Sequence, residues 1–536
     1  MILQRIGNRG IQLGSLFDKA ASRYPAGVVV LDHDLHIVPE LGRTLIMSSL
    51  ADLVDDFASR LWAAEVRPGD HVVIYKSDSF DILLLAVAVA RIGAIPVLLS
   101  PKLDGATVAG LLPRTGRPYL LSDQEKLDAE LPASVFDLAE TVLLASGSHP
   151  NAIELAGLAG VTRVDPVLMP PDHPTLVTHT SGTTGTPKLA VHTGRSLQAR
   201  YRPQASAFAL LRRRETVAMH VSFVHSRIIT ATAIALYRGL PLLVLADDDP
   251  DHVAGIFAAL RPGVIEAHPN SFMRWEELAD DPRRPLANVK LFSSTFDAIH
   301  PRTVQRLLRA TERRAPLFGQ LYGQSETGPI VLRTYSRRRS PDADGRCVGF
   351  PFPGMTGIRI TSRDGRPTGK SSPGYIEVRS DGRAVTFLGE PARYAEQANG
   401  SWWRMGDLGY RSRWGCLHLL DREVDEIPGF GSTLAAEDLL LSKLADLAEV
   451  VIIPGPDGSV LPVISTKDDA PLDPAAWRAA AVDLPPMADP VHKPLAELPH
   501  TATTKIKRLE LARTLADEFA RSSSPTERAH PSPRST

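Results

Sequence analysis

The sequence is poor in cysteine and in net charge, and each of these two shortages excludes a class of protein. Its 536 residues include 2 cysteines and 6% aromatic residues, and the formal net charge is −1. Cys347 and Cys416 are too few for a disulfide framework and lack the spacing of metal ligands, so they fit a reducing cytoplasm. The balanced charge gives no electrostatic bias toward nucleic acid or an anionic membrane.

Long hydrophobic runs are also missing. The longest apolar run, residues 82–90, is followed by Arg91 and predicts a buried helix rather than a membrane span. The N-terminus carries Arg5 and Arg9 without the apolar core that a signal peptide needs. We therefore expect no membrane association and a cytoplasmic location.

Helix and strand patterns alternate along the first part of the chain. Residues 50–64 and 78–92 have the apolar period of helices, whereas 71–75 and 94–98 read as buried strands. Such alternation is typical of an α/β fold with parallel strands. The same alternation returns between residues 240 and 292. We predict a large α/β domain of mixed and parallel sheets flanked by helices.

The pattern changes twice after this region. Short strands between Gly and Pro turns predict a β-subdomain over residues 345–420, which completes a large domain of residues 1–420. Residues 421–515 predict a small, mobile α/β domain, in which prolines replace a clear helix between 468 and 494. The composition of residues 516–536 predicts a disordered tail.

A loop rich in hydroxyls and glycine, residues 178–188, is the strongest chemical signal. Its glycines let backbone N–H groups approach phosphate oxygens, and its lysine adds a point charge. Strand patterns flank the loop, whereas a Walker loop opens a helix. The alternative is an ordinary surface loop. The expected nucleotide ligands are Thr180, Ser181, Gly182, Thr183, Thr184, Gly185 and Lys188.

Four more segments carry candidate chemistry, and they follow this loop in order. They are residues 322–328 (YGQSETG), 403–410 (WRMGDLGY), 421–427 (DREVDEI) and 498–508 (LPHTATTKIKR). An aromatic ring suits a purine, and a carboxylate suits a hard cation that bridges phosphates. Together with the loop, they resemble the motifs of the adenylate-forming superfamily, which includes acyl-CoA synthetases, peptide-synthetase adenylation domains and luciferase.

The resemblance covers roughly residues 10–515 and implies a role for each matching residue. Nucleotide binding would involve Tyr322, Gly323, Gln324, Ser325, Asp407 and Arg422, with the tyrosine against adenine and the aspartate on the ribose. Glu326 and Thr180 would hold Mg²⁺. Lys505 falls on the catalytic lysine, and Lys188 and His225 complete the implied catalytic set.

The hinge and the terminal motif depart from the family pattern. Asp421 stands for a glycine, Val424 for an aspartate, Pro428 for a lysine and Thr504 for a glycine. Proline fixes φ where a hinge must change it, so a second half-reaction that depends on rotation is in question. These departures also leave open a non-catalytic homologue that binds nucleotide.

The substrate pocket predicts an acid that is neither an α-amino acid nor a long-chain fatty acid. Residues 222–225 lack the aspartate that would pair with an ammonium group, and His225 is either a carboxylate neighbour or a core histidine. Thr295, Phe296 and Asp297 replace a glycine-rich stretch with bulk and polarity. We therefore expect an aryl or short polar acid.

Several acceptors of the activated group are compatible with the sequence. The resemblance implies an AMP-forming acid–thiol ligase that uses ATP and Mg²⁺ and transfers the acyl group to coenzyme A or to the phosphopantetheine of a separate carrier protein. The alternatives are an amide ligase and an ATP-dependent diazotase that condenses nitrite with an aromatic amine. A chain rich in Arg, Ala and Pro is typical of a GC-rich genome and suggests specialised metabolism, such as antibiotic biosynthesis.

Overall fold

The computed structural model describes residues 10–180, 186–208, 215–295, 299–338, 345–500 and 506–523. The chain divides into two compact units, Met1–Leu419 and Leu420–Thr536. Within the described residues, no helix is both long and apolar enough to cross a membrane.

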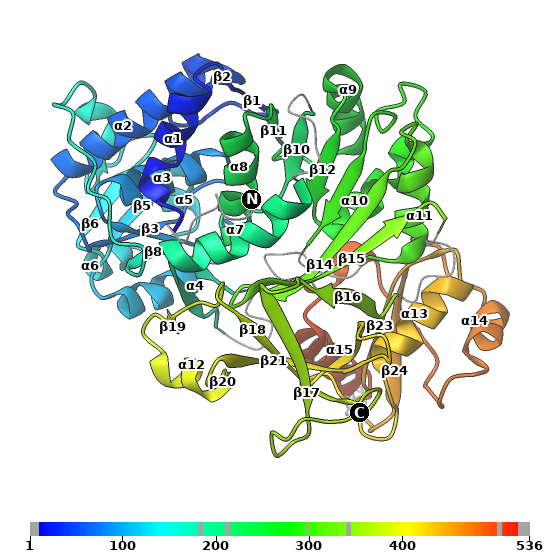
Figure 1. Ribbon diagram of the computed structural model, residues 1–536. Coiled ribbons are helices and arrows are strands. Elements are labelled where there is room, and N and C mark those ends of the chain that lie inside the picture. The colour runs from blue at the N-terminus through cyan, green and yellow to red at the C-terminus, as the bar shows by residue number, and fades with distance from the viewer. Residues whose placement is uncertain are drawn as a thin grey trace, which may run out of the picture. The chain divides into compact units, whose positions relative to one another are not determined.

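One sheet of the first unit is mostly parallel and carries the hydroxyl-rich loop (Figure 1). Its antiparallel edge pairs the strands on either side of that loop. In spatial order its strands are β19 (Thr386–Phe387), β9 (Leu189–Thr193), β8 (Pro174–His179), β4 (Ile95–Leu98), β3 (His71–Ile74), β5 (Tyr119–Ser122), β6 (Thr141–Leu144) and β7 (Ile153–Glu154).

A second sheet has a parallel centre and antiparallel ends. The register aligns His220, Ala267 and Ser294, so three neighbouring strands end at the same edge. In spatial order this part contains β2 (Thr44–Ile46), β1 (Val28–Leu31), β11 (Leu242–Val244), β10 (Val217–His220), β12 (Val264–Ala267), β13 (Leu291–Ser294), β14 (Leu317–Gln324) and β15 (Gly328–Ser336).

The second sheet continues into a β-rich region with its own core, which includes Ile376, Trp403 and Leu417. Pairing runs from β15 through β16 to β22 and is antiparallel throughout. The strands are β16 (Cys347–Pro351), β17 (Thr356–Thr361), β18 (Gly374–Ser380), β20 (Ala398–Asn399), β21 (Trp402–Arg411) and β22 (Leu417–Arg422).

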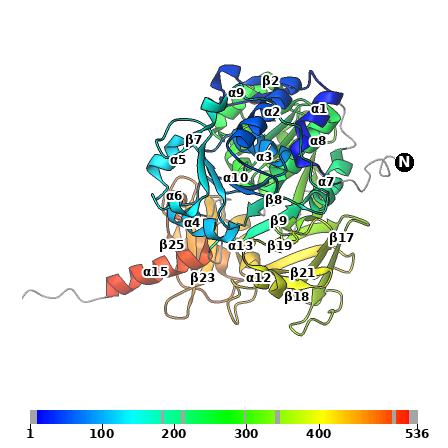
Figure 2. The same ribbon diagram turned by 90° about the vertical axis from the view of Figure 1, so that its left-hand side faces the viewer.

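Helices lie on the faces of both α/β sheets (Figures 1 and 2). Val72 and Ile74 of β3 belong to the core formed with α2, α3 and α8, whereas Val73 faces the opposite core, as expected for period-2 alternation. The helices of this unit are α1 (Leu16–Arg23), α2 (Met47–Ala63), α3 (Asp81–Arg91), α4 (Gly105–Leu111), α5 (Gln124–Ala129), α6 (Val135–Leu138), α7 (Gly194–Phe208), α8 (Ser226–Arg238), α9 (Pro250–Leu260), α10 (Pro269–Arg274), α11 (Pro301–Ala310) and α12 (Pro391–Gln397).

The second unit is a small α/β structure around a short sheet, in the order β23–β24–β25. Leu447, Ile452 and Ile464 pack with α13 and α14 on one face, and Val463 belongs to a second core with Leu515 of α15. Its elements are α13 (Thr433–Lys443), β23 (Leu447–Pro454), β24 (Val460–Thr466), α14 (Pro474–Ala481), β25 (Val491–His492) and α15 (Arg508–Ser523).

Two expectations for this unit are wrong. The expected loss of a helix between residues 468 and 494 fails because α14 forms ahead of the later prolines, with Asp473 as its N-cap and Trp477 buried. The expected disorder from residue 516 fails over 516–523, because α15 continues through this stretch from a first part that packs Leu511 and Leu515 into the core.

The expectation for the cysteines is also corrected. Cys347 and Cys416 form a disulfide, and together with His418 they are a group that could ligate a metal. The pair is separated by 69 residues in the chain. Its proximity depends on the pairing of β16 with β22, which spacing in the sequence does not reveal.

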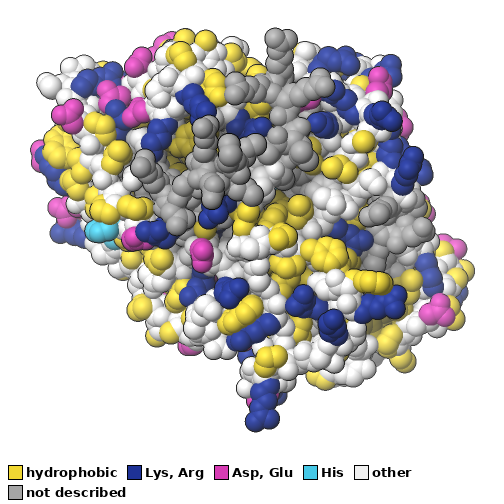
Figure 3. Space-filling model, in the orientation of Figure 1, with side chains coloured by type: hydrophobic (Ala, Val, Ile, Leu, Met, Phe, Trp, Pro, Cys, Tyr) yellow, Lys and Arg dark blue, Asp and Glu magenta, His cyan; other side chains and the backbone are white. Residues whose placement is uncertain are grey.

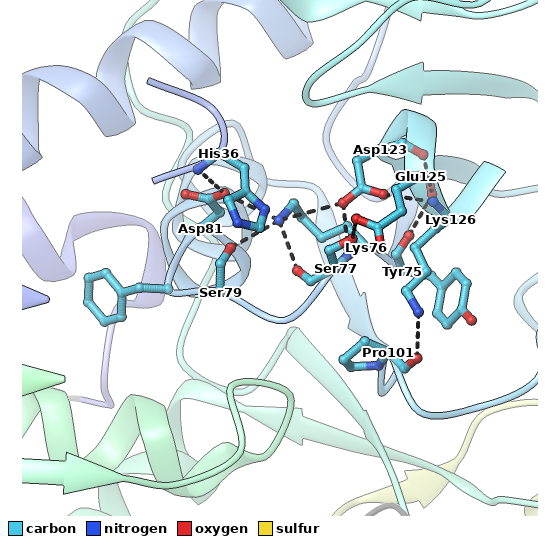
Figure 4. Close-up of polar contacts among 12 residues, drawn as sticks. His36, Tyr75, Lys76, Ser77, Ser79, Asp81, Pro101, Asp123, Glu125 and Lys126 are labelled. Carbon is cyan, nitrogen blue, oxygen red and sulfur yellow. Dashed lines mark hydrogen bonds and ion pairs between the residues drawn. The ribbon is translucent and has the colours of Figure 1, made fainter. Parts of the chain in front are cut away.

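A buried charge network fixes the strand ends near α3 (Figure 4). The Nζ atom of Lys76, a fully buried side chain, donates to Ser79 Oγ at 3.0 Å and to Asp81 Oδ2 at 3.2 Å, and lies 3.9 Å from Asp123 Oδ2. Asp81 also accepts from the backbone N–H of His36 at 3.0 Å. Two carboxylates thus compensate one buried cation, as burial of a charge requires.

Replacement of Lys76 by methionine is expected to lower the free energy of unfolding by about 3–5 kcal/mol, because both carboxylates would lose their buried counter-charge. Urea unfolding at pH 7.5 measures this difference. The exposed Lys370 provides the control, since Lys370→Met is expected to change stability by less than about 0.5 kcal/mol. Equal midpoints for the two variants would contradict the assignment.

Candidate active site

The hydroxyl-rich loop is closed at its base by two hydrogen bonds. The N–H of Thr180 donates to the carbonyl of Lys188 at 2.9 Å, and the N–H of Lys188 donates to Thr180 Oγ1 at 3.2 Å. These residues extend the antiparallel pair β8–β9, so the ladder itself brings the ends of the loop together. Five of the expected ligands, Ser181, Gly182, Thr183, Thr184 and Gly185, lie outside the described residues.

Lys188 connects this loop to the second motif. Its Nζ atom lies 3.0 Å from Glu326 Oε1, and both side chains are largely buried. The same ammonium lies 4.8 Å from the centre of the Phe387 ring and within hydrogen-bond distance of Gln397. The structure therefore brings together two site residues that are 138 positions apart (326 − 188) in the chain.

The second motif is a tight turn between β14 and β15. A Cβ atom on Gly323 would lie 2.0 Å from the carbonyl oxygen of Gly328. Any residue other than glycine at position 323 would therefore require a shift of the backbone. The φ angle of Gly328 is +69°, in the left-handed region that favours glycine. Ser325 and Glu326 occupy the turn between these glycines.

The second and third motifs meet through side chains. Tyr322 Oη donates to Asp407 Oδ2 at 2.5 Å, and Gln324 Nε2 donates to the carbonyl of Met405. Both contacts join β14 to β21. A half-buried tyrosine and a half-buried carboxylate side by side are suited to an aromatic base and a sugar diol.

Arg200 of α7 was not predicted from the sequence, although its contacts place it among the motif residues. Its guanidinium donates to the carbonyls of Gly382 at 2.6 Å and Ser325 at 2.9 Å, and to Ser226 Oγ at 2.7 Å. Burial lowers the pKa of Arg200 to about 9, and the nearby carboxylate of Glu326 partly opposes this shift. No local motif signals Arg200, because its partners come from distant segments.

His225 precedes α8 and belongs to a group of buried imidazoles. Its Nδ1 lies 3.0 Å from Ser222 Oγ, and its ring centre is 5.6 Å from that of His179. His179 donates through Nδ1 to the carbonyl of Thr180 and accepts through Nε2 from the N–H of Ser100, which fixes a neutral tautomer. Burial, with a smaller contribution from His179, lowers the pKa of His225 to about 3.

The depressed pKa of His225 predicts acid sensitivity. The unfolded chain binds a proton at this residue below about pH 6.5, whereas the folded chain resists protonation down to about pH 3. Its contribution to stability is thus complete above pH 6.5 and is lost as the pH falls toward 3. Between pH 7.5 and 5, His225→Asn is expected to lose about 2 kcal/mol less unfolding free energy than the parent protein. Urea titrations at both pH values test this, and equal losses would contradict it.

A buried ion pair begins two residues after His225 in the chain. Arg227, in the first turn of α8, contacts both carboxylate oxygens of Glu266 on β12 through Nε and Nη2. Its Nη1 atom is buried and has no hydrogen-bond partner among the described residues. Thr295, just after β13, likewise has a buried Oγ1 without a partner there. Buried polar atoms of this kind are suited to polar groups of a ligand.

Comparison with known proteins decides the family. The model of the AMP-binding enzyme family matches residues 17–387. The chain belongs to this family of AMP-binding enzymes. It is similar to 3-amino-2-hydroxy-4-methoxybenzoate diazotase of Streptomyces cremeus, with 46% identity over 96% of this chain and 97% of that protein. It is also similar to 3-aminoavenalumate diazotase of a Streptomyces species, with 24% identity over 89% of each chain.

Solved structures agree on the fold of this AMP-binding enzyme. The structure of the anthranilate CoA ligase AuaEII in complex with anthranoyl-AMP has a TM-score of 0.80, at 18% identity, and the match covers 96% of this chain and 98% of that one. The α/β prediction and the assignment to the adenylate-forming superfamily are thereby confirmed.

The remaining predicted residues belong to the second unit or lie outside the description. Arg422, the last residue of β22, is half-buried in the second unit. Asp421 occupies the hinge position at which the family pattern has glycine. Its Oδ1 accepts hydrogen bonds from the N–H and Oγ1 of Thr433 and so anchors the start of α13. Lys505, Phe296 and Asp297 lie outside the described residues.

The oxygen donors of the site fit Mg²⁺. Glu326 offers a carboxylate and Thr180 a hydroxyl, and Lys188 contacts both residues. Oxygen ligands of this kind suit a hard cation that also binds phosphate oxygens.

On the face shown in Figure 3, Lys and Arg side chains are spread among hydrophobic and acidic ones rather than gathered in one patch.

Proposed function

We propose that this AMP-binding enzyme is an ATP-dependent diazotase, which condenses nitrite with the amino group of an aminobenzoic acid and releases AMP and pyrophosphate. The observation that carries the proposal is the 46% identity, over nearly the whole of both chains, with a diazotase of an amino-hydroxy-methoxybenzoate. This choice places the non-thiol acceptor ahead of coenzyme A or a carrier protein. It also fits a role in specialised metabolism.

Buried polar groups in α8 and just after β13 support a substituted aromatic substrate. Arg227 presents a buried Nη1 atom and Thr295 a buried hydroxyl, and both lack partners among the described residues. A hydrocarbon chain would leave these groups unsatisfied, at a cost of about 1–3 kcal/mol for each. A ring with hydroxyl, ether or carboxylate groups satisfies them.

The proposed reaction has two steps whose atoms balance. First, a nitrite oxygen attacks the α-phosphorus of ATP, pyrophosphate leaves, and a nitrosyl adenylate forms. Second, the arylamine nitrogen attacks the nitroso nitrogen and AMP leaves with the bridging oxygen. The resulting N-nitrosamine loses water, after protonation on oxygen, to give the aryl diazonium ion.

The chain's own residues are assigned to the first step as follows. Lys188 and the N–H groups of its loop hold the phosphates, and Lys505 stabilises the charge that develops at the α-phosphate. Ser325 donates to the same phosphate, and Glu326 and Thr180 hold Mg²⁺, which neutralises phosphate charge when bound. Tyr322, with Gly323 and Gln324 beside it, receives adenine, and Asp407 and Arg422 receive the ribose.

His225 is assigned a positioning role in the second step. Its lowered pKa keeps the imidazole neutral throughout the working range of pH, so it orients the substrate by hydrogen bonding and carries no positive charge. Thr295, Phe296 and Asp297 are assigned to the wall of the same pocket. The wall and the Arg227–Glu266 pair would thus fix the ring while its amine attacks.

An isotope experiment tests the proposal. The protein is incubated with ATP, Mg²⁺, a 3-amino-2-hydroxybenzoic acid and nitrite labelled with ¹⁸O, and AMP is analysed by mass spectrometry. One ¹⁸O atom per AMP is expected, together with a diazonium product trapped as an azo dye. A parallel reaction replaces nitrite with coenzyme A.

Each outcome separates the candidate functions. Unlabelled AMP with a coenzyme A thioester would overturn the proposal in favour of an acid–thiol ligase. If labelled nitrite leaves AMP unlabelled, and a parallel reaction with ¹⁸O in the carboxylate of the substrate gives labelled AMP, then the acid and not nitrite is adenylated. Absence of AMP in every reaction, from protein that still binds ATP, would favour a non-catalytic homologue.

A further inference from the structure

Two cysteines and a histidine that belong to none of the candidate motifs converge where β16 pairs with β22. Cys347 and Cys416 form a disulfide, and His418 lies beside them. One ligand atom from each of the three residues lies within 4.8 Å of the others. Thiolate sulfur and imidazole nitrogen are the donors that zinc prefers in proteins.

The backbone register builds this cluster. Cys416 directly precedes β22 and His418 is the second residue of that strand, so these two side chains, two positions apart, leave the same face of the sheet. Cys347 on β16 is the antiparallel partner of His418, and the N–H of Leu419 donates to the carbonyl of Arg346 at 2.9 Å beside this pair. Paired strands, rather than a flexible terminus, therefore hold the three donors together.

The surroundings favour an accessible but oriented site. The half-buried His418 connects the cluster to solvent, whereas the two cysteines are buried, with 8% of each exposed. The ring of His418 stacks on that of Tyr410, with centroids 4.8 Å apart and an interplanar angle of 9°. This stacking limits rotation of the imidazole.

Oxidation and metal binding exclude each other at this place. Sulfurs joined in a disulfide are about 2.05 Å apart. Two thiolates on one tetrahedral zinc, with Zn–S bonds of about 2.3 Å, must be about 3.8 Å apart. The cluster therefore has two alternative covalent states.

We propose that Cys347, Cys416 and His418 form a redox-gated site for a thiophilic divalent cation such as Zn²⁺. A dithiol reductant supplies two electrons and two protons, the S–S bond breaks, and the reductant becomes a disulfide. The ion then binds two thiolates and one imidazole nitrogen with release of two protons, and water occupies the fourth position. Nothing in this site depends on the proposed diazotase chemistry.

The full-length protein, purified without a polyhistidine tag, tests the proposal. One sample is reduced with a dithiol and another is oxidised. Each is equilibrated with Zn²⁺, freed of loose metal by gel filtration, and analysed for zinc by mass spectrometry. We expect about one zinc per chain in the reduced sample and less than a tenth of that in the oxidised one. Co²⁺ in the reduced protein should give thiolate-to-cobalt charge-transfer absorption.

Matched variants separate the site from other histidines and thiols. Cys416→Ser is expected to abolish both the disulfide and the charge-transfer absorption. His418→Gln keeps the disulfide and should weaken Zn²⁺ binding at least tenfold, whereas His173→Gln, at an exposed histidine elsewhere, should leave binding unchanged. Equal zinc in the reduced and oxidised samples, or full binding by His418→Gln, would overturn the proposal.

Discussion

Replacement of Lys505 by alanine is expected to lower the rate of pyrophosphate release by about 10²–10³-fold, with little change in melting temperature. In the proposed reaction Lys505 acts at the α-phosphate, where a cation is needed only while negative charge develops, so its loss should reduce kcat more than substrate binding. The rate is measured with ATP, nitrite and the aminobenzoic substrate under single-turnover conditions, and stability by thermal unfolding.

The local structure of the second unit explains why catalysis and stability should separate. His500 and Ile506 form a β-bridge, the N–H of Lys507 donates to the carbonyl of Pro499 at 2.8 Å, and Arg508 donates to Glu437 at 2.6 and 2.7 Å. In the sequence Lys505 stands between His500 and Ile506, and these contacts, which do not involve its side chain, remain in the variant.

Lys507→Ala supplies the matched control for Lys505→Ala. Lys507 Nζ lies 2.9 Å from the half-exposed carboxylate of Glu510, a surface ion pair worth at most about 1 kcal/mol. Its removal is expected to change the rate less than twofold. Equal losses in the two variants would assign the effect to the charge of the whole segment rather than to Lys505.

Local patterns were sufficient for most of the elements. The strand predicted at residues 71–75 is β3 (His71–Ile74), and the helix predicted at 50–64 is α2 (Met47–Ala63). Period-2 and period-3.6 spacing of apolar residues depends only on neighbours, so these elements could be recognised without tertiary information. The helix α14 and the end of α15 differ from the prediction, because proline content and terminal position are local features, whereas the burial of Trp477 and of Leu515 depends on tertiary packing.

Contacts between distant segments could not be predicted in the same way. The sequence indicated Lys188, Glu326, Tyr322 and Asp407 as separate motif residues, but the contacts Lys188–Glu326 and Tyr322–Asp407 depend on how the strands are ordered. The Cys347–Cys416 disulfide is of the same kind. No sequence motif includes Arg200. The carbonyls of Gly382 and Ser325 that accept its hydrogen bonds belong to distant segments and approach it only in the folded chain.

Arg200→Met is expected to impair both folding stability and nucleotide chemistry. The variant leaves the carbonyls of Ser325 and Gly382 without their buried donor, at a cost of about 3 kcal/mol in unfolding free energy. Ser325 precedes the metal-binding candidate Glu326, and a displacement of this turn by about 1 Å can reduce turnover by 10²-fold. Urea unfolding and kcat/KM for ATP measure the two effects.

Two further substitutions distinguish the effect of the hydrogen-bond geometry of the guanidinium from the effect of its positive charge. Arg200→Lys keeps a cation but cannot reach Gly382, Ser226 and Ser325 together, because an ammonium lacks the planar fork of donors. We expect it to recover part of the stability and little of the kcat/KM for ATP. Arg202→Met, two residues along the same helix, should behave as the parent protein. If Arg200→Lys restored full activity, the charge beside Glu326 would be the essential property, and the position of the Ser325 carbonyl would not.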